Sequence, residues 1–194
     1  MNNNASNILA PSRRLFLGTN ALALSAGAVA LLGGHDAFAA AKPMDIKNDL
    51  AILNVAVGLE HEGIAAYAIA LKSGLLNVQH VIVATKFQDD HKQHNDALIA
   101  TIRKLGGKPV ESKSLDEYAK ELKVDQLKNE DDVLDLAARL ELGATNAYLG
   151  VITAFKDPAL GKIAARLAAD EAAHFALLNF DLKRPFSKAL AFGA

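Results

Sequence analysis

Residues 167–179 read Leu-Ala-Ala-Asp-Glu-Ala-Ala-His-Phe-Ala-Leu-Leu-Asn, and this stretch decides the fold. Its alanine and leucine background favours a helix. Within the helical repeat of three and four residues, Glu171 and His174 fall on the same face as Leu167 and Leu178. Polar groups on an apolar helix face usually have a partner, and a Glu-x-x-His pair indicates a metal ion.

The same pattern occurs twice in the chain, about eighty residues apart. Each copy has a Glu seven residues before a Tyr, followed by a second helix with an Asp and a His four residues apart. The first copy consists of Glu60, Tyr67, Asp90, His91 and His94, and the second of Glu141, Tyr148, Asp170, Glu171 and His174. The repeat predicts two similar helical hairpins.

The apolar pattern predicts four long helices, at about residues 45–73, 78–105, 130–155 and 158–182. The connections within each half are short, which makes the helices of each pair antiparallel. Between the second and third helices lie residues 108–129, with a short helix predicted at 115–122. The expected fold is therefore an all-α antiparallel four-helix bundle with one long crossover between helices 2 and 3.

Facing residues in an antiparallel hairpin have numbers that sum to a constant. Glu60 faces His91 or His94 if the first turn is centred within 75–77, and Glu141 faces His174 if the second is centred at 157–158. Both centres fall in the predicted turns. We therefore expect six polar residues at one level of the interior: Glu60, His91, His94, Glu141, Glu171 and His174.

Three buried carboxylates and three imidazoles are costly without a cation, because each charge loses hydration and the carboxylates repel one another. Oxygen and nitrogen ligands suit iron, manganese or zinc. The chain has no cysteine, which excludes disulfides, iron–sulfur clusters, zinc fingers and cysteine nucleophiles. Its net charge of −1, without a basic stripe, argues against a nucleic-acid partner.

With these motifs the chain resembles the ferritin-like superfamily, and more narrowly the exported bacterial ferritin-like domain proteins, over essentially the whole region after residue 41. The resemblance implies a di-iron or di-manganese centre bound by Glu and His residues. It makes Asp90 and Asp170 candidates for orienting the ligand histidines. Tyr67 and Tyr148 are expected to be core residues whose hydroxyls need a partner.

The first copy departs from the family pattern, because His91 stands where the family has a Glu. A histidine cannot bridge two metals as a carboxylate does, and three carboxylates offset only three of the four charges on two divalent ions. One complete site with a weaker second one, a single metal, or a site without metal therefore remain alternatives to a symmetric dinuclear centre.

Residues 1–41 are predicted to be a twin-arginine export signal. Arg13 and Arg14 precede an apolar stretch, and Ala37-Phe38-Ala39 offers a cleavage site near Ala39. The alternative is a retained membrane anchor, for which the stretch is weakly hydrophobic. We expect residues 42–194 to form one periplasmic domain without stable membrane association after cleavage.

The leading functional hypothesis is a periplasmic metalloprotein of the oxidative-stress type that oxidises iron or reduces peroxide, with metal ions and oxygen or peroxide as its partners. The sequence assigns no catalytic residue and leaves open whether there is turnover. The alternatives are a non-catalytic ferritin-like binding or stress protein with a degenerate site, and a structural zinc site. A homodimer is also left open.

Overall fold

The structure, a computed structural model, describes residues 43–188 and Phe192. The predicted export signal at 1–41 lies outside the described residues. The elements are α1 (Pro43–Lys72), α2 (Val78–Lys104), α3 (Leu115–Glu121), the 3₁₀ turn η2 (Val124–Gln126), α4 (Glu130–Val151) and α5 (Pro158–Asp181). The described part of the chain contains no strand, so the all-helical prediction is confirmed. None of its helices is both long and apolar enough to cross a membrane.

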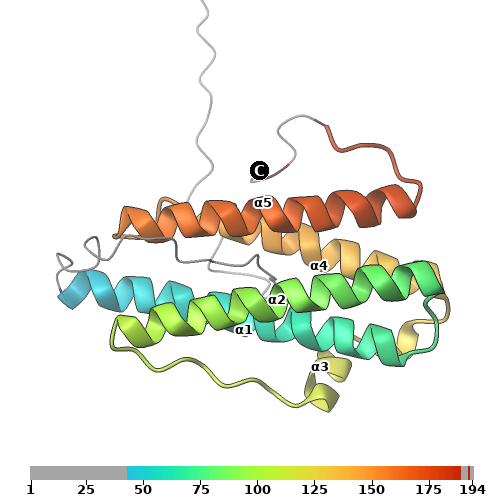
Figure 1. The fold of residues 1–194 in the computed structure, drawn as a ribbon, viewed down its shortest axis with the longest axis horizontal. Coiled ribbons are helices and arrows are strands. Elements are labelled where there is room, and N and C mark those ends of the chain that lie inside the picture. The colour runs from blue at the N-terminus through green and yellow to red at the C-terminus, as the bar shows by residue number, and fades with distance from the viewer. Residues whose placement is uncertain (1–42, 189–191, 193–194) are drawn as a thin grey trace, which may run out of the picture.

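The four long helices α1, α2, α4 and α5 lie side by side, and α3 lies to one side of them on the crossover (Figure 1). The most extensive packing joins α1 to α2 and α4 to α5, and α1 also contacts α3 and α4. Each of the two hairpins thus consists of helices that follow one another in the chain. The crossover between α2 and α4 carries the chain from one hairpin to the other.

The helices begin where a polar side chain can accept a hydrogen bond from the first turn. Asn77, Ser114, Asn129 and Asp157 are these N-terminal caps. After α2 ends, the Gly107 amide donates to the Ile102 carbonyl at 2.9 Å while Gly106 has a φ of +80°, the left-handed conformation that glycine adopts without strain. Asn77 and Asp157 lie in the two short turns, so these two caps help to set the level at which facing residues meet.

The end of α4 was predicted at residue 155, but the helix ends at Val151. Asp49, only 2% exposed, accepts hydrogen bonds from the amides of Lys156 at 2.8 Å and Asp157 at 3.0 Å. A buried carboxylate that accepts two amide donors stabilises the non-helical connection. The early end therefore depends on a residue more than a hundred positions away.

The core has two main apolar clusters, separated along α1 and α2 by the polar residues of the repeat. The first includes Leu53, Val57, Leu98, Ile102 and Leu167. The second includes Tyr67, Ala84, Phe87, Leu134 and Leu178. The polar level is therefore flanked by well-packed hydrocarbon, which removes it from solvent and holds its helices in place.

Candidate metal centre

All six predicted ligand residues lie in the interior, and each of the four long helices contributes at least one. None is more than 6% exposed: Glu60, His91, Glu141 and Glu171 are at 0%, His94 at 1% and His174 at 6%. Ionisable side chains are almost never this deeply buried unless they are paired. The cluster is therefore a site that the fold maintains at an energetic cost.

The hairpin count made from the sequence agrees with the measured contacts. His94 Nδ1 lies 3.7 Å from Glu60 Oε2, and His174 Nδ1 lies 3.6 Å from Glu141 Oε1. The donor atoms form two groups within which all atoms are no more than 4.8 Å apart. One consists of His91, Glu141, Glu171 and His174, and the other of Glu60, His91 and His94. Either group could hold a metal ion.

Several donor atoms in this cluster make no hydrogen bond within the described residues. They are both ring nitrogens of His91, Nδ1 of His94, Nδ1 of His174 and both carboxylate oxygens of Glu171. A buried polar atom without a partner costs about 1–3 kcal/mol, so six of them in one cluster oppose folding substantially. A divalent cation would satisfy them together, and the nitrogen and oxygen donor set suits iron or manganese. The residues present therefore fit the metal centre that the sequence predicts.

The two tyrosines of the repeat hold two of the carboxylates in place. The Tyr67 hydroxyl donates to Glu141 Oε1 at 2.5 Å, and the Tyr148 hydroxyl donates to Glu60 Oε1 at 2.8 Å. Burial raises the pKa of both tyrosines well above 10, and the nearby carboxylate charges add to the effect. Both hydroxyls therefore stay protonated and act as donors.

In the absence of a metal ion, the two histidines of α2 have very different pKa values. Burial by itself would lower the pKa of His91, but the charges of Glu141 and Glu60 outweigh it and raise the pKa to about 9. Burial lowers the pKa of His94 far below its ordinary value, and repulsion from His91 adds to this. His94 is therefore a neutral imidazole, the form that binds metal, while His91 carries a proton at neutral pH.

The pKa values of Glu141 and Glu171 also shift in opposite directions. Burial and the charge of Glu141 raise the pKa of Glu171 well above 4.5. For Glu141, burial also acts to raise the pKa, but the neighbouring Glu171 carboxyl and the charge of His91 lower it well below 4.5. Such divergence between neighbouring carboxyls is typical of functional sites.

Asp90 approaches a ligand histidine of the opposite hairpin. Its Oδ2 lies 3.4 Å from His174 Nε2, and Lys86 forms an ion pair with the same carboxylate. The Phe87 ring stacks on the His174 ring at 3.8 Å between centroids, with 24° between their planes. Sequence reasoning missed Lys86 and Phe87. The spacing of four residues between Lys86 and Asp90 was the available signal for the first.

Asp170 does not occupy the equivalent place in the second copy. It is exposed and forms no ion pair with His94 or His174 among the described residues. His61 and Glu62, next to Glu60 on α1, are partly buried. His80, near the start of α2, lies 2.8 Å from Glu130 and 3.4 Å from Asp181, away from the cluster.

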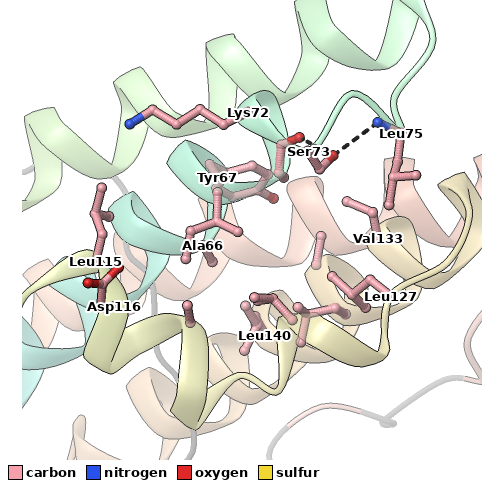
Figure 2. A pocket seen from close by; sticks show the side chains of 16 residues that line it. Ala66, Tyr67, Lys72, Ser73, Leu75, Leu115, Asp116, Leu127, Val133 and Leu140 are labelled. Atoms are coloured by element: carbon pink, nitrogen blue, oxygen red, sulfur yellow. Dashed lines mark hydrogen bonds between the residues drawn. The ribbon is translucent and has the colours of Figure 1, made fainter.

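A pocket of about 560 Å³ lies beside the cluster, between α1, α3, η2 and α4 (Figure 2). Its walls are mainly apolar, and its rim includes the exposed residues Lys72, Leu115 and Asp116. Tyr67 lines the pocket and also donates to Glu141. Tyr67 therefore contacts the pocket on one side and the candidate ligand Glu141 on the other. The sequence did not indicate this pocket.

The chain belongs to the ferritin-like domain family, whose model matches residues 48–183. Among solved structures it is similar to a conserved hypothetical protein, rv2844, from Mycobacterium tuberculosis, with a TM-score of 0.60 and 21% sequence identity. That match covers 75% of this chain and 99% of the other. At this level of identity the likeness shows the fold alone. The comparison with curated proteins found no match.

Proposed function

We propose that this protein is a periplasmic ferritin-like metalloprotein whose antiparallel four-helix bundle binds two iron or manganese ions and uses them to oxidise iron or reduce peroxide. The observation that carries the proposal is the set of buried donor atoms without hydrogen bonds, contributed by His91, His94, Glu171 and His174. A divalent cation would satisfy imidazole nitrogens and carboxylate oxygens together in this small volume.

Glu60 and His94 would hold one ion, and Glu141 and His174 the other, with His91 and Glu171 between them. Two ferrous ions would supply the two electrons that reduce one hydrogen peroxide, with two protons, to two waters. Tyr148 and Tyr67 orient Glu60 and Glu141, and Asp90 orients His174. The apolar clusters on either side keep bulk water away from the bound ions.

Oxygen or peroxide must reach a cluster whose residues are at most 6% exposed. The pocket beside Tyr67 is the opening that fits this need, because its rim is exposed and its inner wall touches the hydrogen bond to Glu141. Electrons would come from the iron itself or from an external donor.

Metal analysis of the protein recovered from the periplasm tests the proposal. We expect iron or manganese in the wild type, and oxidation of added ferrous iron by peroxide above the buffer rate. Glu171→Ala and His174→Ala should each release the metal. Glu62→Ala, a change on α1 outside the cluster, should leave metal content unchanged. Less than about a fifth of an equivalent of metal per chain, together with no oxidation above buffer, contradicts the proposal.

A second candidate function is a ferritin-like binding or stress domain without turnover. The observation that favours it is His91, which brings a positive charge into the cluster where a fourth carboxylate would balance a second divalent ion. This candidate predicts normal folding and periplasmic recovery with no oxidation at any iron concentration. Bound zinc without redox activity would support a structural zinc site instead.

Periplasmic location follows from the export signal inferred at 1–41, which lies outside the described residues. Changing both Arg13 and Arg14 to Lys should retain the unprocessed chain in the cytoplasm. Cell fractionation with an antibody against the folded domain measures this. Changing Lys42 and Lys47 to Arg is a charge-matched control that should leave export intact, and equal export of both variants contradicts the twin-arginine route.

A further inference from the structure

The ring of His91 lies between the two halves of the cluster, with one nitrogen toward each. Nδ1 lies 3.5 Å from Glu60 Oε2, while Nε2 lies 3.4 Å from Glu141 Oε1. Neither nitrogen makes a hydrogen bond within the described residues. His91 is also the residue shared by both groups of potential ligands. The ring is thus placed to serve two ions at once.

Glu171 divides its two oxygens in the same manner. Oε1 lies 3.6 Å from His94 Nδ1, on the side of Glu60, and Oε2 lies 3.7 Å from His174 Nδ1, on the side of Glu141. The half with Glu141 therefore has four donors, and the half with Glu60 has three, with Glu171 beside them. The three are Nδ1 of His91, Nδ1 of His94 and Oε2 of Glu60, and Oε1 of Glu171 lies 3.6 Å from Nδ1 of His94 and 4.0 Å from Nδ1 of His91. The four are Nε2 of His91, Nδ1 of His174, Oε1 of Glu141 and Oε2 of Glu171.

The separations agree with the size of a metal site. Four donors at tetrahedral angles, each about 2.1 Å from one metal, lie about 3.4 Å from one another. The separations between imidazole nitrogens and carboxylate oxygens are 3.5, 3.6, 3.7 and 4.0 Å on the side of Glu60, and 3.4, 3.6 and 3.7 Å on the side of Glu141. These nitrogen–oxygen separations equal or slightly exceed the ideal, so binding of an ion would shorten most of them by a few tenths of an ångström.

We propose that His91 bridges two metal ions as an imidazolate, binding one through Nδ1 and the other through Nε2, with Glu171 as the second bridge. This inference rests on the proposed function and concerns how its two ions are joined. It gives His91 a bridging role through nitrogen in the place where a Glu would bridge through oxygen.

Charge balance supports the imidazolate. Two divalent ions carry four positive charges, and Glu60, Glu141 and Glu171 supply three negative charges. Each nitrogen of His91 releases its proton to solvent as it binds a metal, which leaves the ring with one negative charge. The four ligand charges then neutralise the two ions inside an apolar core, where a net charge would be costly.

An imidazolate bridge has a structural signature that differs from a carboxylate-bridged pair. Its ions lie on opposite sides of a five-membered ring, well beyond the roughly 3.5–4 Å of ordinary two-metal centres. X-ray absorption of the full-length mature protein loaded with manganese(II) alone measures that distance, and elemental analysis counts the ions. We expect two ions per chain and no metal neighbour at about 3.5–4 Å.

Two variants and one control complete the experiment. His91→Glu should retain two ions and gain a metal neighbour at about 3.5–4 Å, because a carboxylate bridges through oxygen. His91→Gln, whose side chain has no imidazole nitrogen to bind either ion, should fall to one ion or fewer. His80→Gln removes an imidazole at the end of the bundle and should behave as the wild type. Circular dichroism verifies that each variant keeps its helical content.

The outcomes separate this inference from the proposed function. A short metal–metal distance in the wild type, or two ions in His91→Gln, would each overturn the bridge while leaving the two-ion centre intact. A single ion per wild-type chain overturns both the bridge and the two-ion centre, while metal binding itself remains. A wild-type protein that binds no metal overturns the proposed function, and the bridge with it.

Discussion

The Tyr148 hydroxyl on α4 donates a 2.8 Å hydrogen bond to Glu60 Oε1 on α1, across 88 residues of sequence. The Tyr67 hydroxyl on α1 makes the reciprocal bond to Glu141 Oε1 on α4, across 74 residues. Each tyrosine therefore orients the carboxylate of the other copy of the repeat. The pair joins the two hairpins at the level of the candidate metal centre.

Tyr148→Phe should lower the free energy of unfolding by about 1–3 kcal/mol, because Glu60 loses a buried donor. Chemical denaturation followed by circular dichroism measures the change. Tyr118→Phe is the matched control, since Tyr118 is 3% exposed and its hydroxyl has only a 3.4 Å contact from the Lys113 amide. We expect that control to lose less than about 1 kcal/mol. Equal losses in the two variants would contradict a special role for the bond to Glu60.

The sequence predicts this fold well because its buried residues recur at the three- and four-residue spacing of a helix. The spacing of three and four residues places Glu171 and His174 on the face that Leu167 and Leu178 bury, and short turns determine which residues meet within a hairpin. Contacts between the hairpins were not predictable in this way. The Tyr148–Glu60 bond depends on how α1 and α4 pack together, which neither helix specifies by itself.

The similarity of the two copies was also a poor guide to the residues around the ligands. Asp90 and Asp170 occupy equivalent places in the repeat, yet Asp90 lies 3.4 Å from His174 and Asp170 is exposed. Residue spacing along one helix does not determine whether a side chain at the edge of its buried face reaches a neighbouring helix, because that depends on how the two helices pack.

Asp90→Asn should weaken metal binding about 10–100-fold, because an amide orients the His174 ring less strongly than a carboxylate does. Competition with a chelator of known affinity measures the change. Asp89→Asn is the adjacent control, since the Asp89 carboxylate is exposed and pairs with Lys92 at 2.9 Å. If both variants bind metal as tightly as the wild type, Asp90 does not position His174.

Metal binding should release protons, and the release should depend on pH through His91. Its pKa of about 9 means that the ring is protonated at pH 7.5 in the metal-free protein, and a nitrogen must lose its proton before it binds a metal. The apparent metal affinity should therefore rise more steeply with pH below about 9 than above it, where the neutral ring has one proton left to lose. Calorimetry in buffers of different ionisation enthalpy counts the protons released at pH 7.5 and at pH 10.

The wild type should release more protons at pH 7.5 than at pH 10, and His91→Gln should lose most of that difference. The remainder belongs to Glu171, whose raised pKa makes it a second source of protons. Proton release that is independent of pH over this range would show that His91 is neutral before metal binds.

Ala66→Leu should slow the peroxide-dependent oxidation of iron without lowering the metal content. Ala66 lines the pocket next to Tyr67 (Figure 2), so three added carbons reduce the space through which a small oxidant would approach Glu141. Stopped-flow absorbance after mixing ferrous protein with peroxide measures the rate. Ala51→Leu adds the same volume on the exposed face of α1 and should leave the rate unchanged. A wild-type rate in Ala66→Leu would mean that peroxide enters elsewhere, and the slightly exposed edge of His174 is then the place to test.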